Sequence, residues 1–323
     1  MRVFVAGGAG YIGSVCVEEL LNHDYETIVY DNLSEGHRSA VDPRATFIEG
    51  DLSDPDRLME SLEKYECEVI IHFAAHALVG ESMENPGKYF RNNVSNGLNL
   101  LDAAVECGIR KVVFSSTCAT FGIPERVPMN ETLLQNPVNP YGESKKMFEK
   151  ILEWYHQIHR LNFTAFRYFN AAGAGDQFGE HHRVETHLIP NVLKVALKHS
   201  DHCKIFGTDY DTHDGTCIRD YIHVRDLAQA HILGMDSDHS GFYNLGNGEG
   251  YSVRQVIDTC RRVTGCGIEV LEEPRRSGDP SRLVADSSKA KRELGWAPQF
   301  PDLESIVRSA WDWHSRFPNG YSD

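Results

Sequence analysis

The sequence predicts an α/β fold, a Rossmann-type doubly wound parallel sheet followed by a smaller C-terminal domain. Three observations lead to this prediction. The chain begins with a short apolar strand, a glycine-rich turn and an amphipathic helix. Apolar strands then alternate with helical stretches through the first half of the chain. Polar residues follow directly where several of these strands end. Such alternation is typical of a parallel sheet covered by helices on both faces.

The first element is the stretch "RVFVAGGAGYIGSVCVEELL" near the N-terminus. Gly8, Gly10 and Gly13 match G-x-G-x-x-G, and Gly7 with Gly10 and Gly13 gives G-x-x-G-x-x-G. Glycines at these positions permit a tight turn and the close approach of a pyrophosphate to a helix N-terminus. The apolar face of the following helix consists of Ile12, Val15, Val17, Leu20 and Leu21. This pattern predicts a dinucleotide site.

The second strand, "TIVYDN", ends at Asp31. A carboxylate at this point can bind both hydroxyls of an adenosine ribose and repels a 2′-phosphate. NAD is therefore favoured over NADP, although the positive charge of nearby Arg38 weakens this preference.

Three more strands follow, in "ATFIEGDL", "VIIHFAA" and "KVVFSSTCATFG". Ligands of open parallel sheets gather at the carboxyl ends of the strands. We therefore expect Phe73–Ala75 and Ser115–Thr117 to converge there with the helix that begins near Tyr141.

Within "NPYGESKKM", Tyr141 and Lys145 are four residues apart and share one helix face. Such a pair alone is more often a surface tyrosine above a solvated lysine. Beside an oxidised nicotinamide, however, two positive charges would lower the pKa of the phenol. We interpret Tyr141 as a base near neutral pH, with Thr117 bridging to the substrate hydroxyl or holding the substrate.

The glycine turn, "HFAA", "SSTCATFG", "NPYGESK" and "RYFNAAGA" resemble the extended short-chain dehydrogenase/reductases. Motifs in the second half of the chain make this resemblance more specific. The stretches "IFGTDYDTHDGTCIRDYIHVRDLAQAH", "YNLGNGEGYSV", "RRSGDP" and "ELGWAPQF" look like those of UDP-galactose (UDP-glucose) 4-epimerases, and the match runs nearly end to end.

The resemblance implies that Tyr141, Lys145 and Thr117 are catalytic. It also implies NAD as the cofactor. The expected NAD contacts are Gly7, Gly10, Tyr11, Ile12, Gly13, Asp31, Asn32, Asp51, Leu52, Phe73, Ala74, Ala75, Asn92, Ser115, Lys145 and Tyr168. Ala77 stands where some family members carry a lysine that contacts the cofactor, so no such contact is expected there.

The residues expected to bind the UDP-sugar are Thr117, Tyr141, Asn170, His187, Leu188, Phe206, Arg219, Tyr221, Arg276, Asp279 and Leu283. Arginine matches phosphate oxygens, and aspartate accepts from ribose hydroxyls. Phe206 and Tyr168 also fit as core aromatics, and Arg219 as a structural arginine. Counted from Arg276 and Asp279, the resemblance places Leu283 at the position that borders the sugar's 2-substituent in this family. Phe121 replaces a tyrosine of many members, which removes one hydroxyl.

The implied reaction is the interconversion of UDP-galactose and UDP-glucose by oxidation at C4, rotation of the 4-keto sugar and reduction on its other face. Cys118 and Ala119 provide neither the acid nor the base of a 4,6-dehydratase, and the glutamate of a decarboxylase is also absent. An epimerase for UDP-N-acetylhexosamine, UDP-hexuronate or UDP-pentose stays open. A non-catalytic NAD sensor is disfavoured, because Tyr141 and Lys145 are both present.

Composition limits the partners and the location. The net charge of −15 opposes binding to nucleic acid or to an acidic membrane. Without a signal peptide or a long apolar run, we expect a cytoplasmic protein. The scattered cysteines and the "EHH" at 180–182 lack metal-site spacing, so no metal is expected.

The length of 323 residues suggests two domains. We expect a dinucleotide-binding domain over 1–170 and a UDP-sugar-binding domain over 171–323, with the stretch near 221–235 packing back on the first. The resemblance further implies a homodimer built on helices near 88–106 and 141–158.

Overall fold

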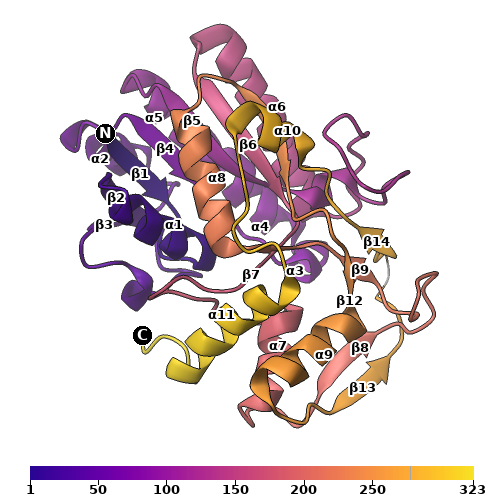
Figure 1. The fold of residues 1–323 in the computed structure, drawn as a ribbon. Coiled ribbons are helices and arrows are strands. Elements are labelled where there is room, and N and C mark those ends of the chain that lie inside the picture. Colours follow the sequence, from indigo (N-terminus) through magenta and orange to yellow (C-terminus); the bar gives the residue numbers. More distant parts are fainter. Residues whose placement is uncertain (277) are drawn as a thin grey trace.

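Seven parallel strands form the central sheet of the protein (Figure 1). The computed structural model describes residues 1–276 and 278–323. The strands are β1 (Arg2–Ala6), β2 (Glu26–Asp31), β3 (Thr46–Glu49), β4 (Val69–His72), β5 (Lys111–Thr117), β6 (Asn162–Tyr168) and β11 (Gly241–Leu245). Their order is β11-β6-β5-β4-β1-β2-β3. The chain thus winds outward from β1 in both directions, which confirms the predicted doubly wound α/β fold and leaves a crevice between the carboxyl ends of β1 and β4.

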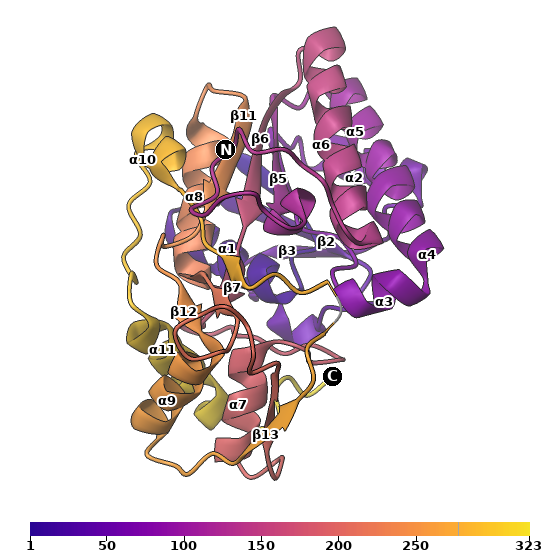
Figure 2. The ribbon, with the colours of Figure 1, turned by 90° about the vertical axis from the view of Figure 1, so that its right-hand side faces the viewer.

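Helices cover both faces of this sheet, as the edge-on view of Figure 2 shows. One face carries α1 (Tyr11–Asn22), α8 (Val224–Asp236) and α10 (Ser288–Leu294), and the other carries α2 (Pro55–Lys64), α5 (Gly97–Glu106) and α6 (Pro140–His159). The burial of β1 explains this arrangement. Val3 and Val5 belong to the core on the α1 side, whereas Phe4 between them belongs to the core on the α5 side. Strands buried on both faces have continuous apolar sequences, as observed here.

Local sequence sets where the two helices nearest the crevice begin. Helix α1 begins directly after the glycine turn, with Gly10 as its N-cap. At the start of α6, the Asn139 side chain accepts a hydrogen bond of 2.8 Å from the backbone N–H of Gly142, and Pro140 occupies the first turn. Tyr141 therefore lies in the first turn of α6, and Lys145 lies one turn later.

Between β4 and α5, the chain forms a nearly continuous helical run. It consists of α3 (Val79–Glu84), α4 (Pro86–Phe90) and the wider turn η2 (Arg91–Asn96), which leads directly into α5. Among the described residues, no helix is long and apolar enough to cross a membrane.

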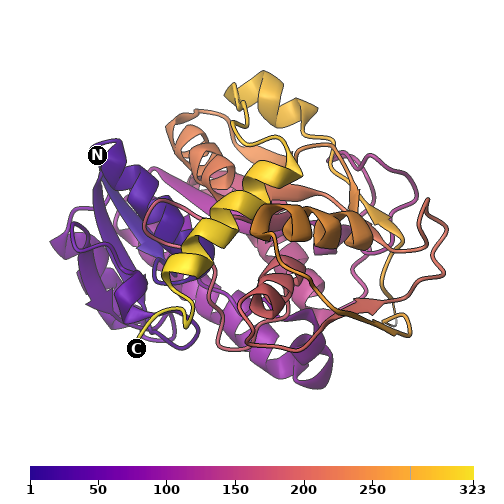
Figure 3. The same cartoon turned by 60° about the horizontal axis from the view of Figure 1, so that its bottom comes forward.

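The C-terminal part has a separate apolar core between three helices. These are α7 (Leu188–Ala196), α9 (Val253–Thr264) and α11 (Leu303–Arg316). In Figure 3 the yellow helix α11 lies beside the orange helix α9. Short strand pairs complete this part: β8 (Cys203–Phe206) with β13 (Val270–Glu273), β7 (Asn170–Ala172) with β10 (Tyr221–His223), and β9 (Ile218–Arg219) with β12 (Tyr251–Ser252) and β14 (Arg282–Leu283).

Three segments beyond residue 170, α8, α10 and β11, belong to the large sheet or to the helices that cover it. Helix α8 packs against α1, and β11 pairs in parallel with β6 from Gly241 opposite Thr164 to Leu245 opposite Tyr168. The linear division at residue 170 stays a prediction. The sheet itself draws on both halves of the chain.

Candidate active site

The glycine turn lies against the carboxyl end of β4. Gly7 has a φ of +83°, and a Cβ added to it would lie 2.4 Å from the backbone nitrogen of Ala74. A Cβ on Gly13 would lie 2.2 Å from the carbonyl oxygen of Gly7. Any side chain at either position would therefore force the turn away from β4 or from α1. Because no side chain covers the turn at these positions, a pyrophosphate can approach the backbone N–H groups at the start of α1.

Asp31 at the end of β2 is fixed to this turn. Its buried carboxylate accepts hydrogen bonds from the backbone N–H groups of Ala9 at 2.9 Å and Leu33 at 2.8 Å. Burial raises the pKa of Asp31, and the two backbone donors act in the opposite direction. Each oxygen keeps a second lone pair for a ribose hydroxyl. Arg38 lies with its guanidinium 4.4 Å from the centre of the Phe47 ring, so it is already packed against a partner.

Three more of the expected NAD contacts, Asn32, Asp51 and Leu52, lie at the neighbouring strand ends. The Asn32 amide donates to the Asp51 carboxylate at 2.5 Å, next to Asp31. Leu52 is buried, and its carbonyl oxygen accepts from the side chain of Asn99 at 2.8 Å. Asn32, Asp51 and Leu52 therefore lie on the same side of the glycine turn as Asp31.

Residue Asn93, which the sequence analysis did not single out, joins two parts of the site. Its buried side chain accepts from the backbone N–H of His76 at 2.9 Å and donates to the His76 carbonyl oxygen at 3.0 Å. It also donates to the Ser144 hydroxyl at 3.1 Å. Asn93 thereby fixes the loop after Phe73–Ala75 to the helix of Tyr141. The neighbouring Asn92 was predicted, and its amide donates to the Asn93 oxygen at 3.0 Å.

The proposed catalytic residues gather at the end of β5. Lys145 is only 3% exposed, and its Nζ donates to the carbonyl oxygen of Ser115 at 2.7 Å. Its ammonium also lies 4.8 Å from the centre of the Phe114 ring. Burial lowers the pKa of Lys145 to about 7, and the carboxylate of Glu149 acts against that shift. The buried Thr117 hydroxyl accepts from the backbone N–H of Ala119 at 3.1 Å.

Tyr141 lies beside Thr117, and its environment differs from the expected one. Burial raises the pKa of the Tyr141 phenol to about 12, while a hydrogen bond with the Thr117 side chain lowers it. The protein groups alone thus do not produce the lowered pKa that the sequence analysis expected. That expectation rests on the additional positive charge of an oxidised nicotinamide.

A buried ion pair that the sequence analysis missed supports the end of β5. The guanidinium of Arg167 donates to both carboxylate oxygens of Glu149, at 2.9 and 2.7 Å. The side chains are 4% and 3% exposed. Ser116 donates to the same carboxylate at 2.5 Å, and Gln135 donates at 2.7 Å. The sequence did contain one indication of the role of Glu149. It follows Lys145 by four residues on the same helix, so the two side chains share one helix face.

Several predicted cofactor contacts pack around His231 on α8. The Tyr168 hydroxyl lies 2.5 Å from Nε2 of His231, and the Phe73 ring centre lies 4.8 Å from that of the imidazole. Helix α8 thus packs, through His231, against two of the predicted NAD contacts. On the other side of the turn, the Tyr11 hydroxyl donates to the Gly173 carbonyl oxygen at 2.7 Å, whereas Ile12 packs into the core.

The predicted UDP-sugar residues form smaller groups in the C-terminal part. Arg219 forms an ion pair with Asp279, and in the β9–β14 pairing Arg219 lies opposite Leu283. The Arg276 guanidinium lies 3.9 Å from the centre of the Phe206 ring. Asn170 pairs with Tyr221 between β7 and β10, and His187 and Leu188 stand at the start of α7.

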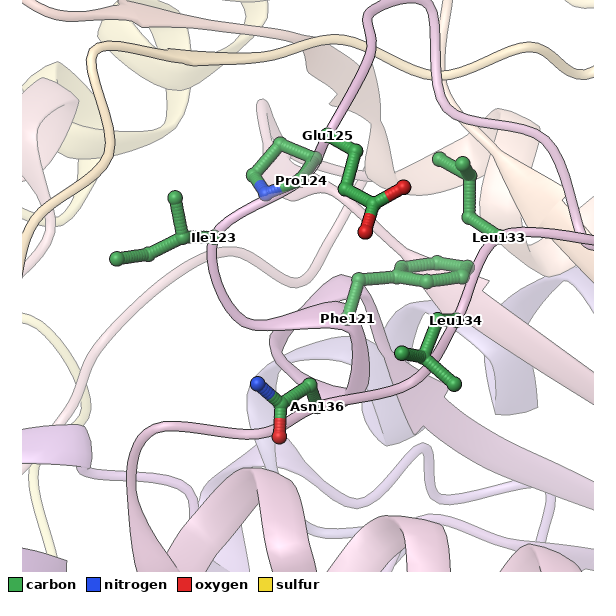
Figure 4. Close-up of a pocket in the computed structure, with 7 residues that line it drawn as sticks. All are labelled: Phe121, Ile123, Pro124, Glu125, Leu133, Leu134 and Asn136. Carbon is green, nitrogen blue, oxygen red and sulfur yellow. The ribbon is translucent and has the colours of Figure 1, made fainter.

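Leu283 also borders a small apolar cluster behind the end of β5. The buried members are Phe121, Met129, Phe169 and Ala285. Phe121 thus occupies an apolar position, which suits a ring without a hydroxyl. A neighbouring hollow of about 60 Å³ (Figure 4) is lined by Phe121, Ile123, Pro124, Glu125, Leu133, Leu134 and Asn136. Ligand pockets are usually ~300 Å³ or larger, so this hollow does not hold a nucleotide.

Comparisons with known proteins show which family this chain is similar to. The model of the NAD dependent epimerase/dehydratase family matches residues 3–246. The UDP-glucose 4-epimerase of Lactobacillus helveticus is 46% identical, and the match covers 100% of both chains. A crystal structure of a UDP-glucose 4-epimerase is 47% identical with a TM-score of 0.98 and covers 100% of both chains. That of the Bifidobacterium longum enzyme in complex with NAD+ and UDP is 36% identical with a TM-score of 0.94, covering 99% of this chain and 100% of the other.

Proposed function

This chain belongs to the NAD dependent epimerase/dehydratase family, and we propose that it is a UDP-glucose 4-epimerase that uses NAD to interconvert UDP-glucose and UDP-galactose. The observation that carries this proposal is the placement of Tyr141, Lys145 and Thr117 around the end of β5. That strand end lies in the sheet beside β4, against whose carboxyl end the glycine turn packs. The phenol of Tyr141, the proposed proton acceptor, therefore lies near the proposed NAD site.

The protein groups divide the work of the reaction. Bound NAD supplies the hydride chemistry, by which C4 of the sugar is oxidised and then reduced on its opposite face. Tyr141 accepts the proton of the 4-hydroxyl and later returns it, directly or through Thr117. Lys145, held by the Ser115 carbonyl oxygen, adds positive charge that favours the phenolate. Gly7 and Gly13 admit the pyrophosphate, and Asp31 accepts from the ribose.

The proposed reaction requires that the protein binds the UDP part of the substrate firmly and leaves the sugar free to rotate. Arg219 and Arg276 suit the diphosphate, since guanidinium groups match phosphate oxygens. Asp279, which forms an ion pair with Arg219, suits a hydroxyl of the uridine ribose. A sugar that is bound chiefly through its diphosphate can turn over after oxidation and present the other face of C4.

The direct test is a substrate panel. The purified protein is incubated with UDP-galactose, UDP-N-acetylgalactosamine and UDP-glucuronate, and the products are separated by chromatography. Conversion of UDP-galactose to UDP-glucose is expected to be the fastest reaction. If only UDP-glucuronate or only the N-acetylated sugar reacts, the proposed substrate class is wrong.

Leu283 is expected to set the tolerance toward the 2-substituent of the sugar. In the strand pairing Leu283 lies opposite Arg219, which we propose binds the diphosphate. Leu283 also packs against the apolar cluster that contains Phe121 and Met129. Leu283→Tyr should disfavour N-acetylated sugars and Leu283→Ser should admit them. One misfit side chain discriminates by ~1–3 kcal/mol, so each kcat/KM ratio should move by about tenfold or more. A ratio that is the same in all three proteins would assign Leu283 to the core alone.

We also propose that two copies of the chain associate through α6. Met147, Trp154 and Ile158 on this helix are 42%, 53% and 66% exposed, and their spacing places them along one face. Large apolar side chains grouped in this way are typical of interfaces. Sedimentation at micromolar concentration should give a dimer, and Trp154→Glu should give monomers. A wild-type protein that sediments only as a monomer would contradict the proposal.

A further inference from the structure

A second group of ionisable side chains lies outside the catalytic residues, and it shares His187 with the residues expected to bind the UDP-sugar. Glu180, His182, Glu185 and His187 come from the loop that joins β7 to α7. One ligand atom of each residue lies within 4.8 Å of those of the others. The four residues are spaced E-x-H-x-x-E-x-H in a loop and include two residues of the "EHH" stretch, for which no metal was expected from the sequence.

The donor atoms converge closely. Nδ1 of His187 lies 2.7 Å from Oε1 of Glu180 and 3.2 Å from Oε1 of Glu185. Nε2 of His182 lies 3.3 Å from the same oxygen of Glu180. Both carboxylates are withdrawn from water, since the side chains of Glu180 and Glu185 are 4% and 3% exposed. Two buried carboxylates this close together require compensating positive charge.

Hydrogen bonds satisfy only part of this group, since Oε1 of Glu185 accepts from the backbone N–H of His187 at 2.7 Å. Oε1 of Glu180 and Nε2 of His182 are buried without a hydrogen-bond partner. The imidazole nitrogens of His182 and His187 approach this oxygen of Glu180 to 3.3 and 2.7 Å without forming a hydrogen bond to it. A buried carboxylate oxygen and a buried ring nitrogen that lack hydrogen-bond partners are well suited to share a cation.

We infer that Glu180, His182, Glu185 and His187 bind one divalent transition-metal ion of the zinc type. Imidazole nitrogen and carboxylate oxygen are both ligands of zinc, and imidazole favours such ions over magnesium or calcium. Four protein ligands fill a tetrahedral shell and leave no open position, which is typical of a structural site.

The position of the group indicates what the ion does. His187 is the N-cap residue of α7, so the ion would fix the start of that helix. The His182 ring packs edge-on against the ring of Tyr11, with the ring centres 6.0 Å apart. Tyr11 is the first residue of α1, directly after the glycine turn. The ion would thereby hold the loop 180–187 against the cofactor-binding half of the molecule and stabilise the folded protein.

The test uses the full-length protein without a histidine tag. Metal content is measured by mass spectrometry after extensive dialysis, and binding of ZnCl2 to chelator-treated protein is measured by calorimetry. We expect uptake of one zinc ion per chain, a lower Tm after chelation and recovery of the Tm with ZnCl2. Glu180→Gln and His182→Asn should each weaken zinc binding at least ~10-fold, since even outer-shell changes have effects of that size.

The control is His213→Gln, which removes a histidine with a 53% exposed side chain outside the group and should bind zinc like the wild type. Circular dichroism verifies that each variant is folded, and His182→Asn serves where Glu180→Gln does not fold. The inference is overturned if the wild type contains no transition metal and takes up no zinc. It is equally overturned if both folded ligand variants bind zinc as tightly as the wild type.

Discussion

Replacing Tyr141 by Phe is expected to lower the turnover of UDP-galactose by about 10²–10⁴-fold, the usual contribution of a positioned acid/base group. The substitution removes the phenol oxygen and keeps the ring, so the packing of α6 should not change. Arg219 and Arg276, which we propose bind the diphosphate, are unaffected. The Kd for UDP should therefore stay nearly constant while kcat falls. A Tyr141→Phe enzyme with wild-type turnover would contradict the assignment of the base.

Lys145→Met tests whether the positive charge of Lys145 favours the phenolate form of Tyr141. Burial raises the pKa of Tyr141 to about 12, and the phenolate that accepts the proton predominates only above the pKa. We propose that positive charge from Lys145 and from the nicotinamide of bound NAD lowers that pKa, so activity should rise with pH through an apparent value below 12. Without the ammonium, the rise in kcat/KM should move to higher pH. If the pH profile of Lys145→Met keeps its position, the lysine does not act on the phenol.

The second large effect is expected on stability, from Glu149→Gln. The carboxylate of Glu149 accepts from Arg167, Ser116 and Gln135 at a position removed from water. An amide in its place is neutral, and its NH2 group faces donors. Arg167 would then be a buried charge without its counter-ion. Breaking a buried pair in this way costs about 3–5 kcal/mol of the free energy of unfolding.

A matched control lies on the same helix. Glu153 forms an exposed pair with Lys150 at 2.8 Å, and exposed pairs contribute ~1 kcal/mol or less. Urea unfolding of Glu149→Gln and Glu153→Gln should therefore give clearly different midpoints. Equal losses in the two variants would mean that the Glu149–Arg167 pair does not stabilise the end of β5.

Much of the site was predictable because its signals are local. Gly13 is required by a contact with Gly7 within the same strand–turn–helix unit, and Gly7 is favoured by the positive φ of that turn, so their spacing predicted the turn that the structure contains. Asp31 follows from the position where one strand ends. Tyr141 and Lys145 lie on one face because a helix places residues i and i+4 together. The alternation of strands and helices likewise predicted the parallel sheet, which the structure confirms.

Tertiary structure decided what depends on segments that are distant in the chain. No spacing rule pairs β11 with β6, although their apolar sequences permit it, because parallel partners are joined by long connections. The pairing of Glu149 with Arg167 depends on how α6 lies on β6. The pKa of Tyr141 depends on how completely its surroundings exclude water, a property of the packed molecule. Sequence alone thus determined the family and the sheet, and it predicted the residue types of the candidate site. Packing decided which charges are buried together, because desolvation and charge pairing exist only once distant segments meet.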